Sequence, residues 1–124
     1  MSPLFRRRAG GARPSMSEVT ATEAAELSDH GALLIDVREP YEWAAGHAPA
    51  ARHIPIGQLA QVVPELPGDA RLIVVCRSGN RSAQATQMLT AAGLDAANLT
   101  GGMTAWMRTG LPVVTDSGSP GTVA

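Results

Sequence analysis

Two short runs of apolar residues stand out along the chain, over residues 32–37 and 72–75. Both are rich in Leu, Ile and Val and are too short for helices, which indicates strands buried on both faces of a parallel sheet. Weaker strands are expected at 18–19, around 53–54 and at 95–99, with helices over 20–28, 41–45, 57–63, 81–92 and 103–109. Strands that alternate with helices predict an α/β fold, with a central, mostly parallel sheet of about five strands and helices on both faces.

Local signals support several of these helices. Thr20 and Glu23 have the spacing of a capping box, which opens a helix, and Pro40 suits the first position of the next one. In the helix over 81–92, apolar residues recur at the spacing of one helical face, and Gly93 follows as a candidate left-handed C-cap. The predicted apolar stripe consists of Ala85, Met88, Leu89 and Ala92.

Composition and charge divide the chain of 124 residues into one domain, over residues 16–115, and two tails. Residues 1–15 carry four of the ten arginines among Gly, Pro and Ser, and they are predicted to be a disordered basic tail. An organelle transit peptide, for which the segment is short, and an upstream extension of a chain that starts at Met16 are the open alternatives. Residues 116–124 are predicted to be a second disordered tail from their Ser, Gly and Pro content. From Met16 onward six arginines accompany all eleven acidic residues, so no basic face for nucleic acid is expected.

Several further classes of protein are excluded. No apolar run is long enough to span a bilayer, and no apolar segment follows the N-terminal arginines as in a secretory signal. The only cysteine, Cys76, rules out an intramolecular disulfide. It forms no metal-ligand cluster with the three scattered histidines. We therefore expect a cytoplasmic protein with no membrane partner, metal or other cofactor.

Cys76 stands where the buried strand over 72–75 ends, just ahead of a predicted helix. Ligands of open α/β sheets bind at this edge, and the free N–H groups of a helix N-terminus attract negative charge. Arg77 and Arg81 add positive charge, so the site favours a thiolate over a thiol. The alternative is an inert cysteine buried as a small apolar residue, but such a cysteine has no use for two neighbouring cations.

A series of short motifs follows a fixed order along the chain: Asp36-Val37-Arg38-Glu39, Glu42, Gly46-His47, Ile54-Pro55, Cys76-Arg77-Ser78-Gly79-Asn80-Arg81-Ser82, Gly101-Gly102 and Trp106. This order of motifs resembles a single-domain rhodanese. The resemblance covers about residues 17–114 and implies the rhodanese-like fold. It also implies that Asp36, Arg38 and Glu42 support the site through charge pairs, and that His47 is a structural residue. Trp43 and Trp106 are expected to pack in the core or at its rim.

The resemblance implies a sulfurtransferase with Cys76 as its catalytic residue. The thiolate would take the sulfane sulfur of thiosulfate or a persulfide donor, hold it as a persulfide, and pass it to cyanide, a thiol or a protein acceptor. The backbone N–H groups of residues 77–82 would surround the persulfide, and Arg77 and Arg81 would attract the anionic donor. The predicted substrate-binding residues are thus Arg77, Ser78, Gly79, Asn80, Arg81 and Ser82.

Two alternatives are considered. Phosphatases of this fold have one residue more between cysteine and arginine, and here Ser82 stands where their arginine would be. The shorter loop should suit sulfur better than phosphate or arsenate. The second alternative is a carrier or redox-sensing interaction module that uses Cys76 without rapid turnover, and the sequence does not separate it from the enzyme.

Overall fold

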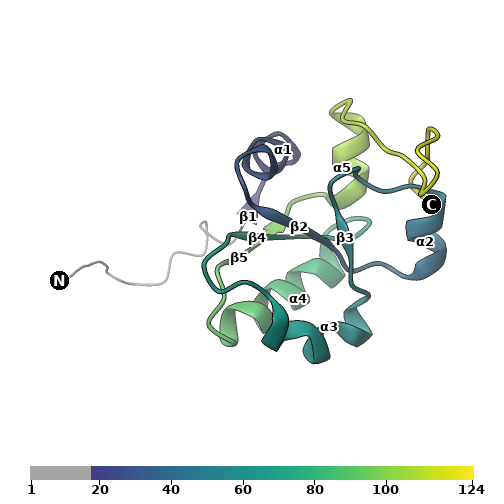
Figure 1. The fold of residues 1–124 in the computed structure, drawn as a ribbon. Helices are drawn as coiled ribbons and strands as arrows, with labels where there is room; N and C mark the ends of the chain where they lie inside the picture. Colours follow the sequence, from purple (N-terminus) through teal and green to yellow (C-terminus); the bar gives the residue numbers. More distant parts are fainter. Residues whose placement is uncertain (1–17) are drawn as a thin grey trace.

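A computed structural model describes residues 18–124, so the basic tail predicted over 1–15 lies outside the described residues (Figure 1). A five-stranded, fully parallel sheet has the strand order β1-β5-β4-β2-β3. The strands are β1 (Glu18–Val19), β2 (Leu33–Asp36), β3 (Arg52–His53), β4 (Leu72–Val75) and β5 (Ala96–Leu99). The predicted α/β sheet is confirmed, and the predicted strongest strands, β2 and β4, lie side by side in it.

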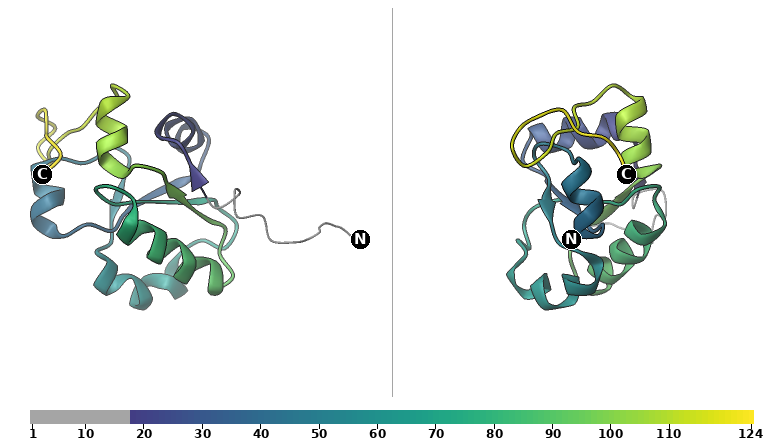
Figure 2. Two further views of the ribbon diagram at one scale, coloured as in Figure 1. Left: turned by 180° about the vertical axis from the view of Figure 1, so that it is seen from behind. Right: turned by 90° about the vertical axis from the view of Figure 1, so that its right-hand side faces the viewer.

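Helices cover both faces of the sheet, as the two views of Figure 2 show. On one face lie α1 (Ala21–Asp29) and α5 (Gly102–Arg108), and on the other lie α3 (Ile56–Val62), its 3₁₀ continuation η2 (Val63–Glu65) and α4 (Asn80–Ala91). The short helix α2 (Pro40–Ala45) follows β2. Each α-helix begins and ends within one residue of its predicted bounds, because caps and breakers are local signals. None of the helices in residues 18–124 has the length and apolarity needed to cross a membrane.

The alternation of side chains along β4 builds two cores from one strand. Ile73 and Val75 pack under α1 and α5, whereas Leu72 and Val74 pack against α3 and α4. All four side chains are fully buried, and burial of each contributes about 1.5–3 kcal/mol. β4 is therefore the buried central strand of the sheet, and Cys76 directly follows its last residue, Val75.

The buried face of α4 differs from the predicted stripe. Ala85 and Leu89 are buried as predicted, but Met88 is 39% exposed and Ala92 lies at the surface. Two hydroxyl residues, Ser82 and Thr86, complete the buried face instead. Thr86 Oγ1 donates to the Ser82 carbonyl at 2.7 Å, and the Ser82 hydroxyl bonds to Cys76 Sγ at 3.2 Å. A hydroxyl with partners can replace an apolar residue, which an apolar pattern does not register.

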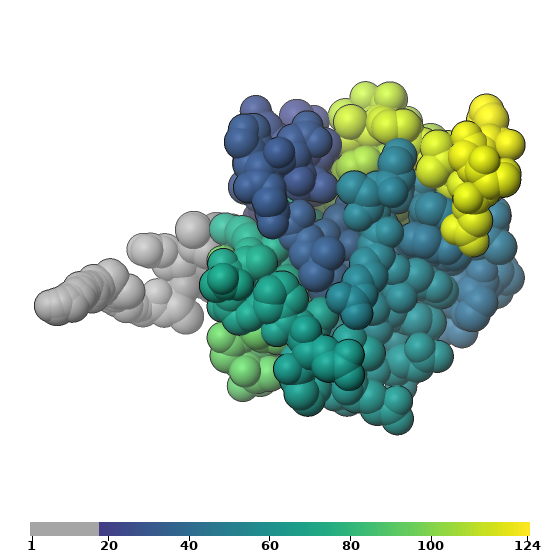
Figure 3. Space-filling view, in the orientation of Figure 1, coloured from purple at the N-terminus to yellow at the C-terminus, as the bar shows by residue number. Residues whose placement is uncertain are grey.

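The C-terminal residues 116–124, predicted to be a disordered tail, instead fold back against α2 (Figure 3). The backbone N–H of Thr122 donates to the Ala45 carbonyl at 2.9 Å. Gly121 lies so close to Gly46 that a Cβ on Gly121 would stand 2.8 Å from the Gly46 Cα. Small residues permit this close backbone approach, so the composition that suggested disorder serves packing here.

Candidate active site

The active loop, residues 76–82, joins β4 to α4. Cys76 follows the strand directly and is 1% exposed. Gly79 caps α4 in the left-handed conformation, with φ at 115°, which a glycine adopts at no steric cost. This turn brings the Gly79 N–H to 3.1 Å from Cys76 Sγ, and the Ser82 hydroxyl reaches the same sulfur at 3.2 Å. The sulfur therefore lies at the N-terminus of a twelve-residue helix with two donors aimed at it.

The polar groups around Cys76 decide its charge. Burial raises the pKa of the Cys76 thiol, but hydrogen bonds from the Ser82 side chain and from the backbone N–H groups of Ser82, Gly79 and Ser78 outweigh it. The pKa thus lies below the ordinary value for cysteine. Because the thiolate is the nucleophile, this favours reactivity at neutral pH.

The Gly101-Gly102 pair lets the N-terminus of α5 pack closely against the backbone of the active loop. The N–H groups of Met103 and Thr104, at the start of α5, donate to the carbonyls of Cys76 and Arg77 at 2.8 and 3.0 Å. A Cβ on Gly102 would clash with both carbonyl oxygens. Only glycine allows this approach, so the motif fixes the backbone of the active loop to α5.

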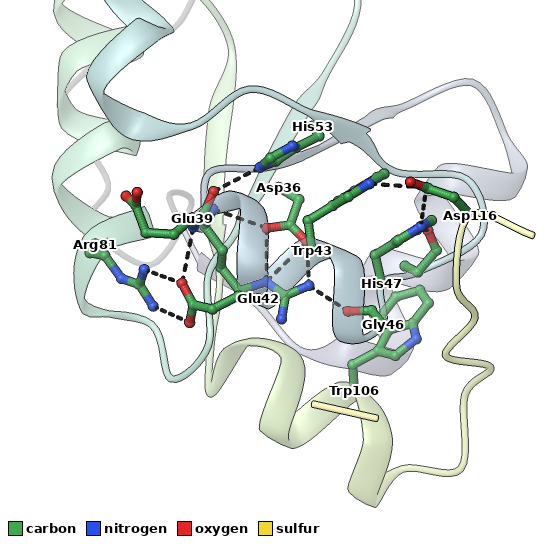
Figure 4. A network of polar contacts seen from close by, with 12 residues as sticks. Asp36, Glu39, Glu42, Trp43, Gly46, His47, His53, Arg81, Trp106 and Asp116 are labelled. Atoms are coloured by element: carbon green, nitrogen blue, oxygen red, sulfur yellow. Dashed lines mark hydrogen bonds and ion pairs between the residues drawn. The ribbon is translucent and has the colours of Figure 1, made fainter. Parts of the chain in front are cut away.

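Arg81 and Glu42 form an ion pair between α4 and α2 (Figure 4). The Arg81 guanidinium donates to the two carboxylate oxygens at 2.7 and 2.9 Å. The hydrogen bond from Arg81 outweighs burial and lowers the pKa of the Glu42 carboxyl, and the same bond raises the pKa of Arg81. The charge of the Cys76 thiolate also favours the Arg81 cation. The pair fixes the Arg81 guanidinium while leaving its side chain 35% exposed.

Asp36 and Arg38 form a second pair, at the end of β2. The Arg38 guanidinium donates to both Asp36 carboxylate oxygens, at distances from 2.8 to 3.1 Å, and to the Gly46 carbonyl at 2.7 Å. Both side chains are fully buried. The three residues predicted as structural support, Asp36, Arg38 and Glu42, therefore all lie in charge pairs, and only the Glu42 pair includes a residue of the active loop.

The remaining loop residues, Arg77, Ser78 and Asn80, are exposed. Within residues 18–124 the Arg77 side chain has no ion-pair partner, unlike Arg81. The loop thus brings together all seven predicted residues but gives its two arginines different surroundings. No group of three or more potential metal ligands occurs in the described part of the chain.

Two polar residues near these elements, Asn98 and Asp116, were not predicted from the sequence. Asn98 of β5 accepts a hydrogen bond from the Ser82 hydroxyl at 2.6 Å. The signal in the sequence that could have indicated this role is a polar residue within a strand that is otherwise apolar. Asp116 accepts from Trp43 Nε1 and lies 3.0 Å from His47 Nε2. His47 stacks on Trp43 with 3.5 Å between ring centroids, and Trp43 is part-buried, as expected for a residue at the rim of the core.

The chain is similar to known proteins over most of its length. A family model described as "Rhodanese-like domain" matches residues 20–109. A sulfurtransferase of Allochromatium vinosum is 39% identical over 103 residues, which cover 82% of this chain and 94% of the relative. Thiosulfate sulfurtransferase GlpE of Pseudomonas aeruginosa is 33% identical over 105 residues, covering 84% and 94%.

The fold is also similar to that of solved structures. A rhodanese-related protein from Thermoplasma volcanium has a TM-score of 0.73 and 34% identity, and the match covers 78% of this chain and 96% of that protein. Sequence and structure therefore lead to the same assignment over most of the chain. The chain belongs to the rhodanese-like family.

Proposed function

We propose that the protein transfers sulfane sulfur through a persulfide on Cys76, with thiosulfate or a persulfide as donor and cyanide, a thiol or a protein as acceptor. The observation that carries the proposal is the position of Cys76 Sγ, 3.1 Å from the Gly79 N–H and 3.2 Å from the Ser82 hydroxyl. These donors stabilise a thiolate, and sulfur transfer needs a thiolate but no general base. The sulfurtransferase names of two relatives support the same reaction.

In the first half-reaction the Cys76 thiolate attacks the outer sulfur of thiosulfate. An S–S bond forms to Sγ while the bond to the sulfite sulfur breaks, and sulfite leaves with that electron pair. The charge then lies on the outer sulfur of the persulfide, where the free N–H groups of the α4 N-terminus and the Arg81 guanidinium stabilise it. Cys76 is 1% exposed, whereas its loop neighbours Arg77 and Ser78 are exposed, so we expect the donor to approach from the side of these residues.

In the second half-reaction an acceptor attacks the outer sulfur. The bond between the outer sulfur and Sγ breaks, and Cys76 leaves as a thiolate. Cyanide yields thiocyanate in this step, and a thiolate acceptor yields a new persulfide. Stabilisation of the Cys76 thiolate therefore serves both half-reactions, first at the nucleophile and then at the leaving group.

Intact mass spectrometry tests the proposal. The purified protein is incubated with thiosulfate, weighed, treated with cyanide and weighed again, while thiocyanate is assayed in solution. We expect a gain of one sulfur atom that cyanide removes with the release of thiocyanate, and no gain in Cys76→Ser. Absence of the mass gain with both thiosulfate and a small persulfide donor would overturn the proposal.

A carrier that receives sulfur from a protein partner is the second candidate. The near-complete burial of Cys76 favours it, because a protein partner can displace the exposed loop residues that a small anion must pass. The enzyme and the carrier should differ in the rates at which Cys76 takes up sulfur from thiosulfate and releases it to small thiols. Slow loading from thiosulfate, followed by stable retention of sulfur in the presence of small thiols, would support the carrier over the enzyme.

A further inference from the structure

Asn98 connects the sheet to the active loop through two hydrogen bonds. Its Nδ2 donates to the Gly79 carbonyl at 3.3 Å, and its Oδ1 lies 2.6 Å from Ser82 Oγ. The side-chain amide has a defined orientation, because the reverse one would place its oxygen against the Gly79 carbonyl oxygen. Asn98 lies on β5, opposite Val74 of the central strand, so its position is set by the sheet.

Ser82 has two acceptors and only one proton to donate. Its hydroxyl lies 2.6 Å from Asn98 Oδ1 and 3.2 Å from Cys76 Sγ. A serine hydroxyl donates one hydrogen bond and accepts others. When its proton points to Asn98, a lone pair faces the sulfur, which suits a neutral thiol that donates its own S–H. When its proton points to a thiolate, two oxygen lone pairs face each other across the short distance to Asn98.

Burial makes this competition matter. Ser82 and Cys76 are at most 1% exposed, and Asn98 is 7% exposed. Whichever acceptor the Ser82 hydroxyl turns away from, Cys76 Sγ or Asn98 Oδ1, water has little access to replace the hydrogen bond. An unsatisfied buried acceptor raises the free energy of the folded state. The orientation of one hydroxyl is thus coupled to the charge on Cys76.

We propose that Asn98 is a positioning residue for Cys76, because it holds the Ser82 hydroxyl proton while the sulfur is neutral and releases it when the thiolate forms. The inference rests on the proposed function for its role in sulfur transfer. The hydroxyl turns toward Sγ in the free thiolate, turns back to Asn98 when Sγ carries the outer sulfur, and turns to Sγ again as Cys76 leaves. The hydroxyl rotates throughout without transferring its proton.

The competition predicts opposite effects for two substitutions. Ser82→Ala removes a donor to the thiolate and should raise the thiol pKa. Asn98→Leu removes the competing acceptor and should lower the thiol pKa, because the Ser82 proton is then free for the sulfur. A loop-supporting role alone predicts the reverse sign for Asn98→Leu, since loosening Gly79 would weaken its N–H bond to the sulfur.

Alkylation of Cys76 by iodoacetamide as a function of pH measures the thiolate without any sulfur donor. At a pH below the thiol pKa, we expect Asn98→Leu to alkylate about threefold to tenfold faster and Ser82→Ala about tenfold slower, since one pKa unit changes the thiolate fraction about tenfold. In the Ser82→Ala background, Asn98→Leu should give no acceleration. Asn98→Ala is the second variant if Asn98→Leu does not fold.

The double-mutant cycle decides the outcome. Acceleration by Asn98→Leu that depends on the Ser82 hydroxyl supports the inference. Equal effects of Asn98→Leu in both backgrounds, or greater slowing when the hydroxyl is present, overturn it. The alkylation assay reads only the thiol, whereas the mass assay reads sulfur uptake, so failure of the inference and failure of the proposed function are separable.

Discussion

The two buried carboxylates beside the active loop hold their arginines in different ways. Asp36 and Arg38 are two residues apart and both fully buried, whereas Glu42 and Arg81 are 39 residues apart and the Arg81 side chain is 35% exposed. Arg38 also bonds to the Gly46 carbonyl, and among the described residues its Nη1 has no partner. The charge of Arg38 is thus enclosed by the fold, while Arg81 retains a face toward solvent.

This difference in exposure suggests a structural role for Arg38 and a role in substrate binding for Arg81. A fully buried guanidinium paired with a carboxylate cannot meet an incoming anion, so we propose that Arg38 acts only in the stability of the strand end. Arg81 lies in the active loop, and the Cys76 thiolate contributes to raising its pKa. Glu42 orients the Arg81 guanidinium. We therefore expect one pair to control folding and the other to control activity.

The largest effect should come from Arg38→Met, which leaves the Asp36 carboxylate buried without its partner. Removing one member of a buried pair costs about 3–5 kcal/mol, so the urea midpoint should fall sharply. Arg81→Met, the matched variant of the pair whose arginine is partly exposed, should cost about 1–2 kcal/mol. The double variant Asp36→Leu with Arg38→Met should recover part of the loss, because no charge remains unpaired. Equal losses for the two single arginine variants would contradict the comparison.

The next effect concerns the sulfur donor. Arg81→Met should raise the thiosulfate KM about tenfold, the equivalent of about 1.4 kcal/mol of lost attraction for the anion. Arg77→Met should have a smaller effect, because no carboxylate of the described chain pairs with Arg77 to hold its guanidinium in place. Arg108→Met, an exposed change at the end of α5, is the control. Steady-state thiocyanate formation measures all three, and an unchanged KM in Arg81→Met would remove Arg81 from donor binding.

Local signals explain why most elements could be predicted from the sequence. The Thr20–Glu23 capping box forms with distances of 3.1 and 2.8 Å, and Pro40 begins α2. Each signal acts within a few residues of the element that it ends or begins. The active loop was predictable for the same reason, because strand, turn glycine and helix follow one another directly.

Contacts between distant residues could not be predicted in this way. The Ser82–Asn98 bond joins residues 16 positions apart, and it turns the polar Ser82 into a buried residue of α4. The fold of residues 116–124 depends on Gly46, far away in the sequence. Composition records only that these residues are small and polar, whereas their partners are brought near by the sheet.

The smallest effect is a dependence of stability on acid pH that the Glu42 pair should give. The hydrogen bond from Arg81 holds the pKa of the Glu42 carboxyl below its ordinary 4.5, although burial of the carboxyl acts to raise this pKa. Because the folded state lowers this pKa, the contribution to stability is present above pH 4.5 and is lost as the pH falls through the lower folded value. Glu42→Gln should therefore be less stable than the parent chain at neutral pH, and the difference should shrink in acid.

Urea unfolding from about pH 7 to about pH 3 at constant ionic strength measures this difference. Glu65→Gln, a change at an exposed residue of η2, is the control. It should leave both the urea midpoint and the pH dependence of the midpoint close to those of the parent chain. The exposed side of Arg81 screens the pair, so the change in midpoint should remain well below that of Arg38→Met. A difference between Glu42→Gln and the parent that stays constant down to acid pH would show that the Glu42–Arg81 bond acts through geometry rather than charge. The contrast between the two arginines would then rest on burial alone.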